Sequence, residues 1–203
     1  MFGSGSAGRI PARSRGRPPS VGRERDREDV TLLMRAAAAL IAGEVPFALI
    51  GAAAMAARGV SRSTVDQDLL VTDARVLQAD FWSSVGGVID ARPGDVSDPL
   101  AGVVRLTADG ERPVDVVIGR GTWMAQILAR TPTVAVPGGV LPVADPADLI
   151  LLKLYAGGSQ DLWDIEQLLA AAQPSAALAE VVDARLAAAP EALRVLWEGR
   201  RSR

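Results

Sequence analysis

The sequence of 203 residues contains no cysteine and no histidine. Without cysteine there are no disulfides, thiolate metal sites or cysteine nucleophiles. Without histidine there are no imidazole ligands and no Ser-His-Asp triad. Acid–base or metal chemistry therefore depends on carboxylates, on the single tyrosine, Tyr155, or on the single lysine, Lys153.

Long hydrophobic runs are also missing. The longest, near Ala37–Ile41 and Leu149–Leu154, are far shorter than the roughly 20 residues of a membrane span. The N-terminal residues include arginines but no apolar stretch of the kind found in signal peptides. The 49% of hydrophobic residues predicts a packed interior. We expect a cytoplasmic protein that does not associate with a membrane.

Three segments differ in composition. Residues 1–28 are rich in Gly, Ser, Pro and Arg, lack a helix or strand period, and are expected to form a disordered tail. Seven arginines against three acidic residues give this tail a net charge of +4, so that −6 remains for the rest of the −2 chain. A solvated tail is the plainer interpretation, and contact with nucleic acid is the alternative. Residues 29–172 are expected to form the folded domain, and 173–203 a C-terminal helical extension.

The folded segment alternates between helical and strand patterns. Asp29 is expected to cap the first helix, which ends at Gly43. Further helices are expected at 51–58, 74–85, 122–130, 146–155 and 159–172, where Ser159 would be the cap, and twice more after Pro174. Strands are expected at 47–50, 66–71, 87–91, 103–107, 114–118, 133–136 and 140–143. This order predicts an α/β fold.

Asp66 and Asp68 lie two residues apart at the start of an expected strand, so both carboxylates face the same side. The apolar residues 69–71 follow at once, so these charges enter the fold, where each needs a partner or a metal. Oxygen ligands without histidine or cysteine favour Mg²⁺ or Mn²⁺. The alternative is a solvated strand end, since the same acidic spacing occurs in the tail at 24–28.

Two further positions extend this pattern. Asp115 stands between valines in an apolar strand, and it completes a three-carboxylate cluster if that strand pairs beside 66–71. The alternative is an ion pair with one of the many arginines. Gly51 lies at a strand-to-helix junction, where free N–H groups bind phosphate and glycine permits close approach. By itself, Gly51 could equally be a tight turn.

Two stretches of the chain resemble the nucleotidyltransferases related to abortive-infection AbiE-type toxins. Residues 50–71 contain Gly-Ala, a helix ending in Gly, Arg-x-Thr, Asp-x-Asp and an apolar strand, in that order. Residues 147–168 are similar to the family's lysine helix and to its Asp-x-x-Asp helix. The resemblance covers roughly residues 45–170.

The resemblance implies a nucleotidyltransferase fold of the polymerase-β-like type, with a small mixed sheet flanked by helices and extra C-terminal helices. It implies transfer of a nucleoside monophosphate from a nucleoside triphosphate (NTP) to RNA, a protein or a small molecule. A toxin–antitoxin or phage-defence role with an antitoxin-like partner is also implied. Asp66, Asp68 and Asp115 would bind Mg²⁺ or Mn²⁺ as the catalytic residues, with Asp115 also a candidate base. The residues that would contact the nucleotide are Gly51, Ala52, Arg62, Thr64, Lys153 and Asp164.

The sequence departs from the family pattern at two places. Ala52 stands where many relatives have serine, and Gly158-Ser-Gln160 stands where relatives often have basic residues. Altered substrate handling and lost activity therefore both stay open. The alternative function is a catalytically inactive binding or partner protein with the same fold.

Deleting residues 1–28 is expected to leave the melting temperature and the NTP affinity unchanged. The tail has too little apolar surface to offset its ordering entropy, and every expected metal or phosphate residue lies beyond it. Thermal melts and NTP titrations of the full-length and truncated chains measure this. If RNA is the acceptor, truncation should also weaken RNA binding and flatten its salt dependence. A large drop in melting temperature would contradict the boundary at Asp29.

Overall fold

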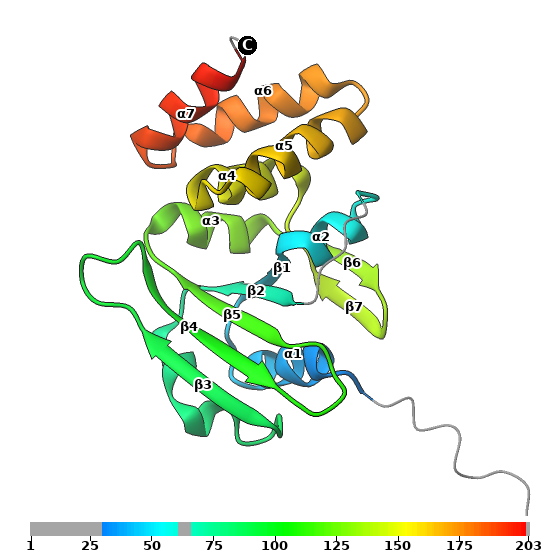
Figure 1. The fold of residues 1–203 in the computed structure, drawn as a ribbon, viewed down its shortest axis with the longest axis vertical. Helices are drawn as coiled ribbons and strands as arrows, with labels where there is room; N and C mark the ends of the chain where they lie inside the picture. Colours follow the sequence, from blue (N-terminus) through cyan, green and yellow to red (C-terminus); the bar gives the residue numbers. More distant parts are fainter. Residues whose placement is uncertain (1–29, 61–65, 202–203) are drawn as a thin grey trace, which may run out of the picture.

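A computed structural model describes residues 30–60 and 66–201 (Figure 1). The prediction of a disordered tail at 1–28 lies outside these residues, and so do the predicted nucleotide contacts Arg62 and Thr64. The segment boundaries at 28 and 172 stay predictions.

The centre of the fold is a five-stranded mixed sheet with the strand order β1-β2-β5-β4-β3. Its strands are β1 (Phe47–Ile50), β2 (Gln67–Val71), β3 (Val88–Pro93), β4 (Leu100–Thr107) and β5 (Val114–Gly119). β2 and β5 are parallel, and every other neighbouring pair is antiparallel. β1 is buried throughout, whereas β4 and the first part of β5 alternate between buried and half-buried residues. One face of the β3–β5 half therefore packs on the core, and the other face stays partly open.

One group of helices packs against the sheet on the core side (Figure 1). Its members are α1 (Leu32–Ala42) and the short 3-10 helices η1 (Ala74–Leu77) and η2 (Ala79–Trp82). These helices contact β3, β4 and β5 and bury Leu40 and Trp82 completely. The core of the domain lies between them and the sheet.

Other elements extend from the strand ends near β1 and β5. They are α2 (Gly51–Ala57), α3 (Thr122–Arg130), β6 (Thr133–Val136) and β7 (Gly139–Pro142). α2 follows β1 without a loop, and the β6–β7 hairpin lies beside β1. The chain then enters four helices that pack together (Figure 1). They are α4 (Pro146–Ala156), α5 (Ser159–Ala171), α6 (Ser175–Leu186) and α7 (Glu191–Arg201).

The expected fold class is confirmed: an α/β chain has a small mixed sheet flanked by helices, with extra helices at the C-terminal end. The predicted hairpin at 108–111 joins β4 to β5 in antiparallel register. The helix predicted at 122–130 has the observed bounds of α3. Within the described part of the chain, every helix is too short or too polar to cross a membrane.

The helix predicted at 74–85 is wrong, because two separate 3-10 helices occupy this stretch. The indole Nε1 of Trp82 donates a hydrogen bond of 2.7 Å to the carbonyl of Val76. In an α-helix that carbonyl would accept from the backbone four residues later. Burial of both side chains favours the turn that the indole stabilises over a continuous helix.

Two predicted helix caps are also wrong. Thr31, not Asp29, caps α1, and its hydroxyl accepts from the N–H of Met34. The N–H of Leu32 is bonded to a carboxylate oxygen of Glu111 at 2.5 Å, a partner 79 residues away that local pattern does not indicate. Ser159 is the first residue of α5 instead of its cap, because Asp161 accepts from the N–H of Gly158 at 3.0 Å and starts the helix one residue earlier.

A buried ion cluster attaches the C-terminal helices to the rest of the fold. Asp148 of α4 is fully buried, and it pairs with Arg130 at the end of α3 and with Arg185 of α6. Arg185 also binds Asp145, the N-cap of α4, at 2.5 Å. Burial alone would raise the pKa of Asp145, but the hydrogen bonds and charge of Arg185 together with backbone N–H donors hold this pKa below its ordinary value. The cluster fixes α3, α4 and α6 against one another.

Replacing Asp148 with Asn is expected to lower the free energy of unfolding by about 3 kcal/mol, because two arginines lose the charge that neutralises them inside the fold. Urea denaturation of both proteins measures the difference. Glu191→Gln is the matched control, since Glu191 pairs with Arg194 on the exposed surface and such pairs contribute little. Similar small effects from both substitutions would show that the buried cluster does not hold the helices.

Candidate active site

A row of charged residues crosses four neighbouring strands of the sheet. In the strand register Asp68 of β2 lies opposite Asp115 of β5, Asp115 lies opposite Arg105 of β4, and Arg105 lies opposite Asp90 of β3. Residues paired in this way project from the same face of a sheet. These four residues, called the charged row below, lie on the partly open face. The predicted pairing of the Asp115 strand beside the Asp66–Asp68 strand is thereby confirmed.

Asp115 has two oxygens in different surroundings. Oδ2 accepts a hydrogen bond of 2.8 Å from Nη1 of Arg105, so the ion pair that was the alternative interpretation of Asp115 is present. Oδ1 is buried and receives no hydrogen bond from any residue that the structure describes. Burial raises the pKa of Asp115, and the nearby charge of Asp66 adds to this rise against the opposing effect of Arg105. The ion pair with Arg105 therefore does not fully offset the cost of burying the Asp115 carboxylate.

Arg105 connects two of the predicted metal ligands. Its Nη2 lies 3.1 Å from Oδ1 of Asp66, while Nη1 binds Asp115. Asp66 immediately precedes β2, and the next residue, Gln67, bonds through its N–H to the carbonyl of Pro113 at 3.0 Å. A single guanidinium therefore lies between the two carboxylates, with about two fifths of its side chain exposed.

Gly51 lies against the carboxylate of Asp68. Its φ is +64°, in the left-handed region, and a Cβ there would lie 2.1 Å from Oδ2 of Asp68. Any side chain at this position would displace the carboxylate, so glycine is required by both space and backbone conformation. The expected nearness of Gly51 to the aspartates is observed for Asp68. Ala52, the next residue, is buried.

The donor chemistry of this site suits a hard divalent cation. All the side-chain ligands are carboxylate oxygens, and Oδ1 of Asp115 is a buried acceptor that receives no hydrogen bond from the described residues. As placed, no three carboxylates within 30–60 and 66–201 lie close enough together to hold an ion. The Arg105 guanidinium instead contacts Asp66 and Asp115 directly. A metal site at Asp66, Asp68 and Asp115 stays a prediction.

Lys153 lies between two carboxylates at the junction of α4 and α5. Its Nζ is 2.8 Å from Oδ1 of Asp161 and 2.8 Å from Oδ2 of Asp164, which is fully buried. Burial lowers the pKa of Lys153, but the hydrogen bonds to the two aspartates outweigh it, so the pKa is raised. Asp164 thus lies beside Lys153, as the resemblance implies. The charge of Lys153 is balanced inside the helical region, and its contact with phosphate stays a prediction.

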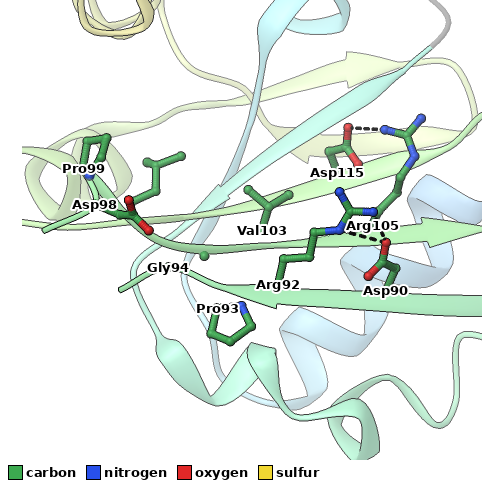
Figure 2. Close-up of a pocket in the computed structure, with 11 residues that line it drawn as sticks. Asp90, Arg92, Pro93, Gly94, Asp98, Pro99, Val103, Arg105 and Asp115 are labelled. Carbon is green, nitrogen blue, oxygen red and sulfur yellow. Dashed lines mark hydrogen bonds and ion pairs between the residues drawn. The ribbon is translucent and has the colours of Figure 1, made fainter. Parts of the chain in front are cut away.

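A pocket of about 450 Å³ opens beside Asp115 on the partly open face. Figure 2 shows Asp90, Arg92, Arg105 and Asp115 gathered on one side of Val103, with Asp98 and Pro99 on the other. Nε of Arg92 binds Oδ2 of Asp90 at 3.0 Å. The loop between β3 and β4, residues 94–99, forms the opposite side of the pocket.

Two long-range contacts hold that loop in place. The guanidinium of Arg120 donates to the backbone carbonyls of Gly94, Asp95 and Val96. The hydroxyl of Tyr155, at the end of α4, donates to the carbonyl of Pro99 at 2.9 Å. The loop is therefore tied both to the end of β5 and to the C-terminal helices.

Arg105, Asp90 and Arg92 were not predicted as site residues from the sequence. One signal was available for Arg105, the only charged residue of β4. The predicted turn at 108–111 fixes the hairpin register and sets Arg105 opposite Asp115. The position of β3 beyond β4 depends on packing, and no comparable signal indicated Asp90 or Arg92.

No protein-family model matches the sequence, and no curated protein matches it. Similar solved structures include the antibiotic-resistance factor ANT(2'')-Ia in solution, 17% identical with a TM-score of 0.46, covering 85% of this chain and 91% of that chain. ANT(2'')-Ia in complex with adenylyl-2''-tobramycin is 15% identical with a TM-score of 0.49, covering 77% and 97%. An antigenic nucleotidyltransferase-like protein from Paracoccidioides brasiliensis is 17% identical with a TM-score of 0.39, covering 82% and 93%. All three likenesses are at low identity, with TM-scores below 0.5.

Proposed function

We propose that the chain is a metal-dependent nucleotidyltransferase that moves a nucleoside monophosphate from an NTP to an acceptor. One observation carries this proposal. Asp68 and Asp115 stand in register on adjacent parallel strands, Asp68 lies against Gly51, and Asp115 keeps one buried oxygen with no donor among the described residues. A buried carboxylate of this kind is costly in a protein that does not use it to bind a cation or substrate.

The roles follow from the positions in the row. Asp66, Asp68 and Asp115 would hold Mg²⁺ or Mn²⁺, and the ion would neutralise charge on the phosphates. Gly51 has no side chain, so the Asp68 carboxylate fits against the backbone at the start of α2, where a triphosphate would lie beside it. Ala52 offers no hydroxyl, which leaves the backbone as the phosphate contact at this turn.

The transfer itself needs no covalent enzyme intermediate. An acceptor hydroxyl attacks the α-phosphorus, a new O–P bond forms, the bond to the β-phosphate oxygen breaks, and pyrophosphate leaves. Asp115 is positioned to accept the proton of that hydroxyl. Reactions of this kind depend on positioning and on charge neutralisation more than on a protein nucleophile.

The resemblance also assigns Arg62, Thr64, Lys153 and Asp164 to the nucleotide. Lys153 already pairs with Asp161 and Asp164, so a phosphate would compete with these two carboxylates for its charge. In the arrangement described, its effect on the nucleotide would come through the position of α4. The toxin or phage-defence role, an antitoxin-like partner and a cytoplasmic location remain parts of this proposal that rest on sequence alone.

The second candidate function is an inactive partner protein with the same fold. The contact that favours it is Arg105, which pairs with both Asp66 and Asp115 and so competes with a cation for these carboxylates. Ala52 in place of serine also favours the inactive partner protein. The two functions differ in one measurable respect: only the enzyme needs a cation to displace Arg105 from these carboxylates.

NTP binding is expected to require Mg²⁺ or Mn²⁺ and to weaken by about tenfold or more in Asp68→Asn, since loss of one charged ligand costs upward of 1.4 kcal/mol. Titration calorimetry with each NTP, with Mg²⁺ and with EDTA, gives both affinities. Asp109→Asn, in the exposed turn between β4 and β5, is the matched control and should bind as the parent does. Equal affinity with EDTA would favour the inactive partner protein.

Replacing Arg105 with Gln is expected to raise the Mn²⁺ affinity by about fivefold, because the ion no longer competes with a guanidinium worth about 1 kcal/mol at a half-exposed site. Electron paramagnetic resonance of free Mn²⁺ measures this without any activity assay. Arg92→Gln is the matched control. Arg92 lies on the same face but binds Asp90, so its loss should change the Mn²⁺ affinity little. An unchanged or weaker affinity in Arg105→Gln would mean that Asp66 and Asp115 do not bind the ion.

A further inference from the structure

The pocket beside Asp115 lies at the opposite end of the charged row from Gly51. Gly51 contacts Asp68, Asp68 faces Asp115, and the pocket extends from Asp115 over β4 and β3 (Figure 2). The proposed phosphate side and the pocket therefore meet at Asp115. A second substrate held in this pocket would present its reacting atom to a nucleotide held on the other side.

The charged residues that line the pocket are three carboxylates and two guanidinium groups, a small negative excess. Arg105 pairs with Asp115 and Arg92 with Asp90, and Asp98 adds a third carboxylate, so the lining has a net charge of −1. An anionic ligand is disfavoured by such a wall, and a neutral ligand is not. A ligand with several closely spaced hydroxyl groups finds fixed donors and acceptors, because carboxylates accept and guanidinium groups donate in planar arrays.

The remaining surface of the pocket is largely apolar. Val103 is half-buried in the middle of β4, and Pro93, Pro99 and Leu100 line the pocket around it. Apolar surface bounded by planar polar groups suits a ring with an apolar face and hydroxyl groups at its edge. The volume of about 450 Å³ lies within the range of small-molecule sites, about 300–1,000 Å³.

Two features favour a small molecule over a nucleic acid end. The loop at 94–99 is held over one side of the pocket by Arg120 and Tyr155, which limits the space for a continuing polymer. In addition, the chain after residue 28 carries a net charge of −6, which repels a phosphate backbone.

We propose that this pocket binds the acceptor, and that the acceptor is a small, neutral, polyhydroxylated ring: a sugar with vicinal hydroxyl groups. This inference rests on the proposed function and names its second substrate. One sugar hydroxyl attacks the α-phosphorus of the NTP, the new O–P bond forms as the bond to the β-phosphate oxygen breaks, pyrophosphate leaves, and the hydroxyl proton passes to the Asp115 carboxylate. The product is a sugar carrying a nucleoside monophosphate.

The test uses the full chain with Mg²⁺ and an NTP labelled at the α-phosphate. The probes are a panel of neutral methyl glycosides and disaccharides and, in a separate arm, a short RNA with a free 3′ ribose. Methyl NMR reports binding at Val103 and Leu100, and label transfer reports reaction. At least one sugar should shift these methyl signals at concentrations up to about 10 mM and accept label.

Val103→Phe fills the centre of the pocket and should reduce sugar binding and label transfer by about tenfold or more, through lost contact area and space. Val88→Phe is the matched control, an identical substitution on β3 at an exposed valine outside the pocket. Asp90→Asn serves as a second variant at a surface position that does not threaten the fold, and it too should weaken the sugar. Mg²⁺-dependent NTP affinity should stay unchanged in all three.

The outcomes separate this inference from the proposed function. If NTP binds with Mg²⁺ but no neutral sugar shifts the pocket methyls, the acceptor inference is wrong and the enzyme proposal stands. Transfer of label to the RNA alone, or transfer to sugar that is unaffected by Val103→Phe, also overturns it. If NTP does not bind at all, the proposed function fails first.

Discussion

The parallel pairing of β2 with β5 is the constraint on which the rest of the structure depends. It joins the chain before residue 72 to the chain after residue 113, and the segment between them supplies β3 and β4 on one side of β5. Leu69, Leu70 and Val116 on these two strands are fully buried. Apolar burial thus sets the register, and the register then brings Asp68 beside Asp115 at the open end. A shift of one residue would turn the carboxylates toward the core.

Much of the fold could be predicted because its signals are local. Alternating valines identify β5, the turn at 108–111 identifies the hairpin, and Pro146 after Asp145 marks the start of α4. The errors arise where distant groups decide the local structure. Glu111 sets the start of α1 from 79 residues away, and the indole of Trp82 takes the Val76 carbonyl that a helix would use. No local pattern contains those partners.

The candidate site also has features that the sequence predicts and features that depend on distant contacts. The aspartates and Gly51 could be found from sequence because a charge in an apolar strand and a glycine at a strand end are conspicuous by position. The ion pairs of those aspartates could not be predicted, because both involve Arg105, which lies on another strand and reaches them only in the folded chain. Lys153 illustrates the reverse case. As the only lysine it suggested a phosphate contact, but two aspartates of α5 balance its charge. Electrostatic partners decide what a charged residue is available to do.

The contact between Gly51 and Asp68 has a consequence for how this chain and its relatives can diverge. The carboxylate occupies the volume that any Cβ at position 51 would need. No side chain fits at position 51 as long as position 68 is an aspartate. This steric constraint is relieved only when the side chain at position 68 becomes shorter. Lineages that retain the carboxylate should keep glycine, and in those that have lost it the left-handed backbone at φ +64° still favours glycine. Glycine at position 51 is thus held by two independent constraints, and loss of the acidic side chain removes only the steric one.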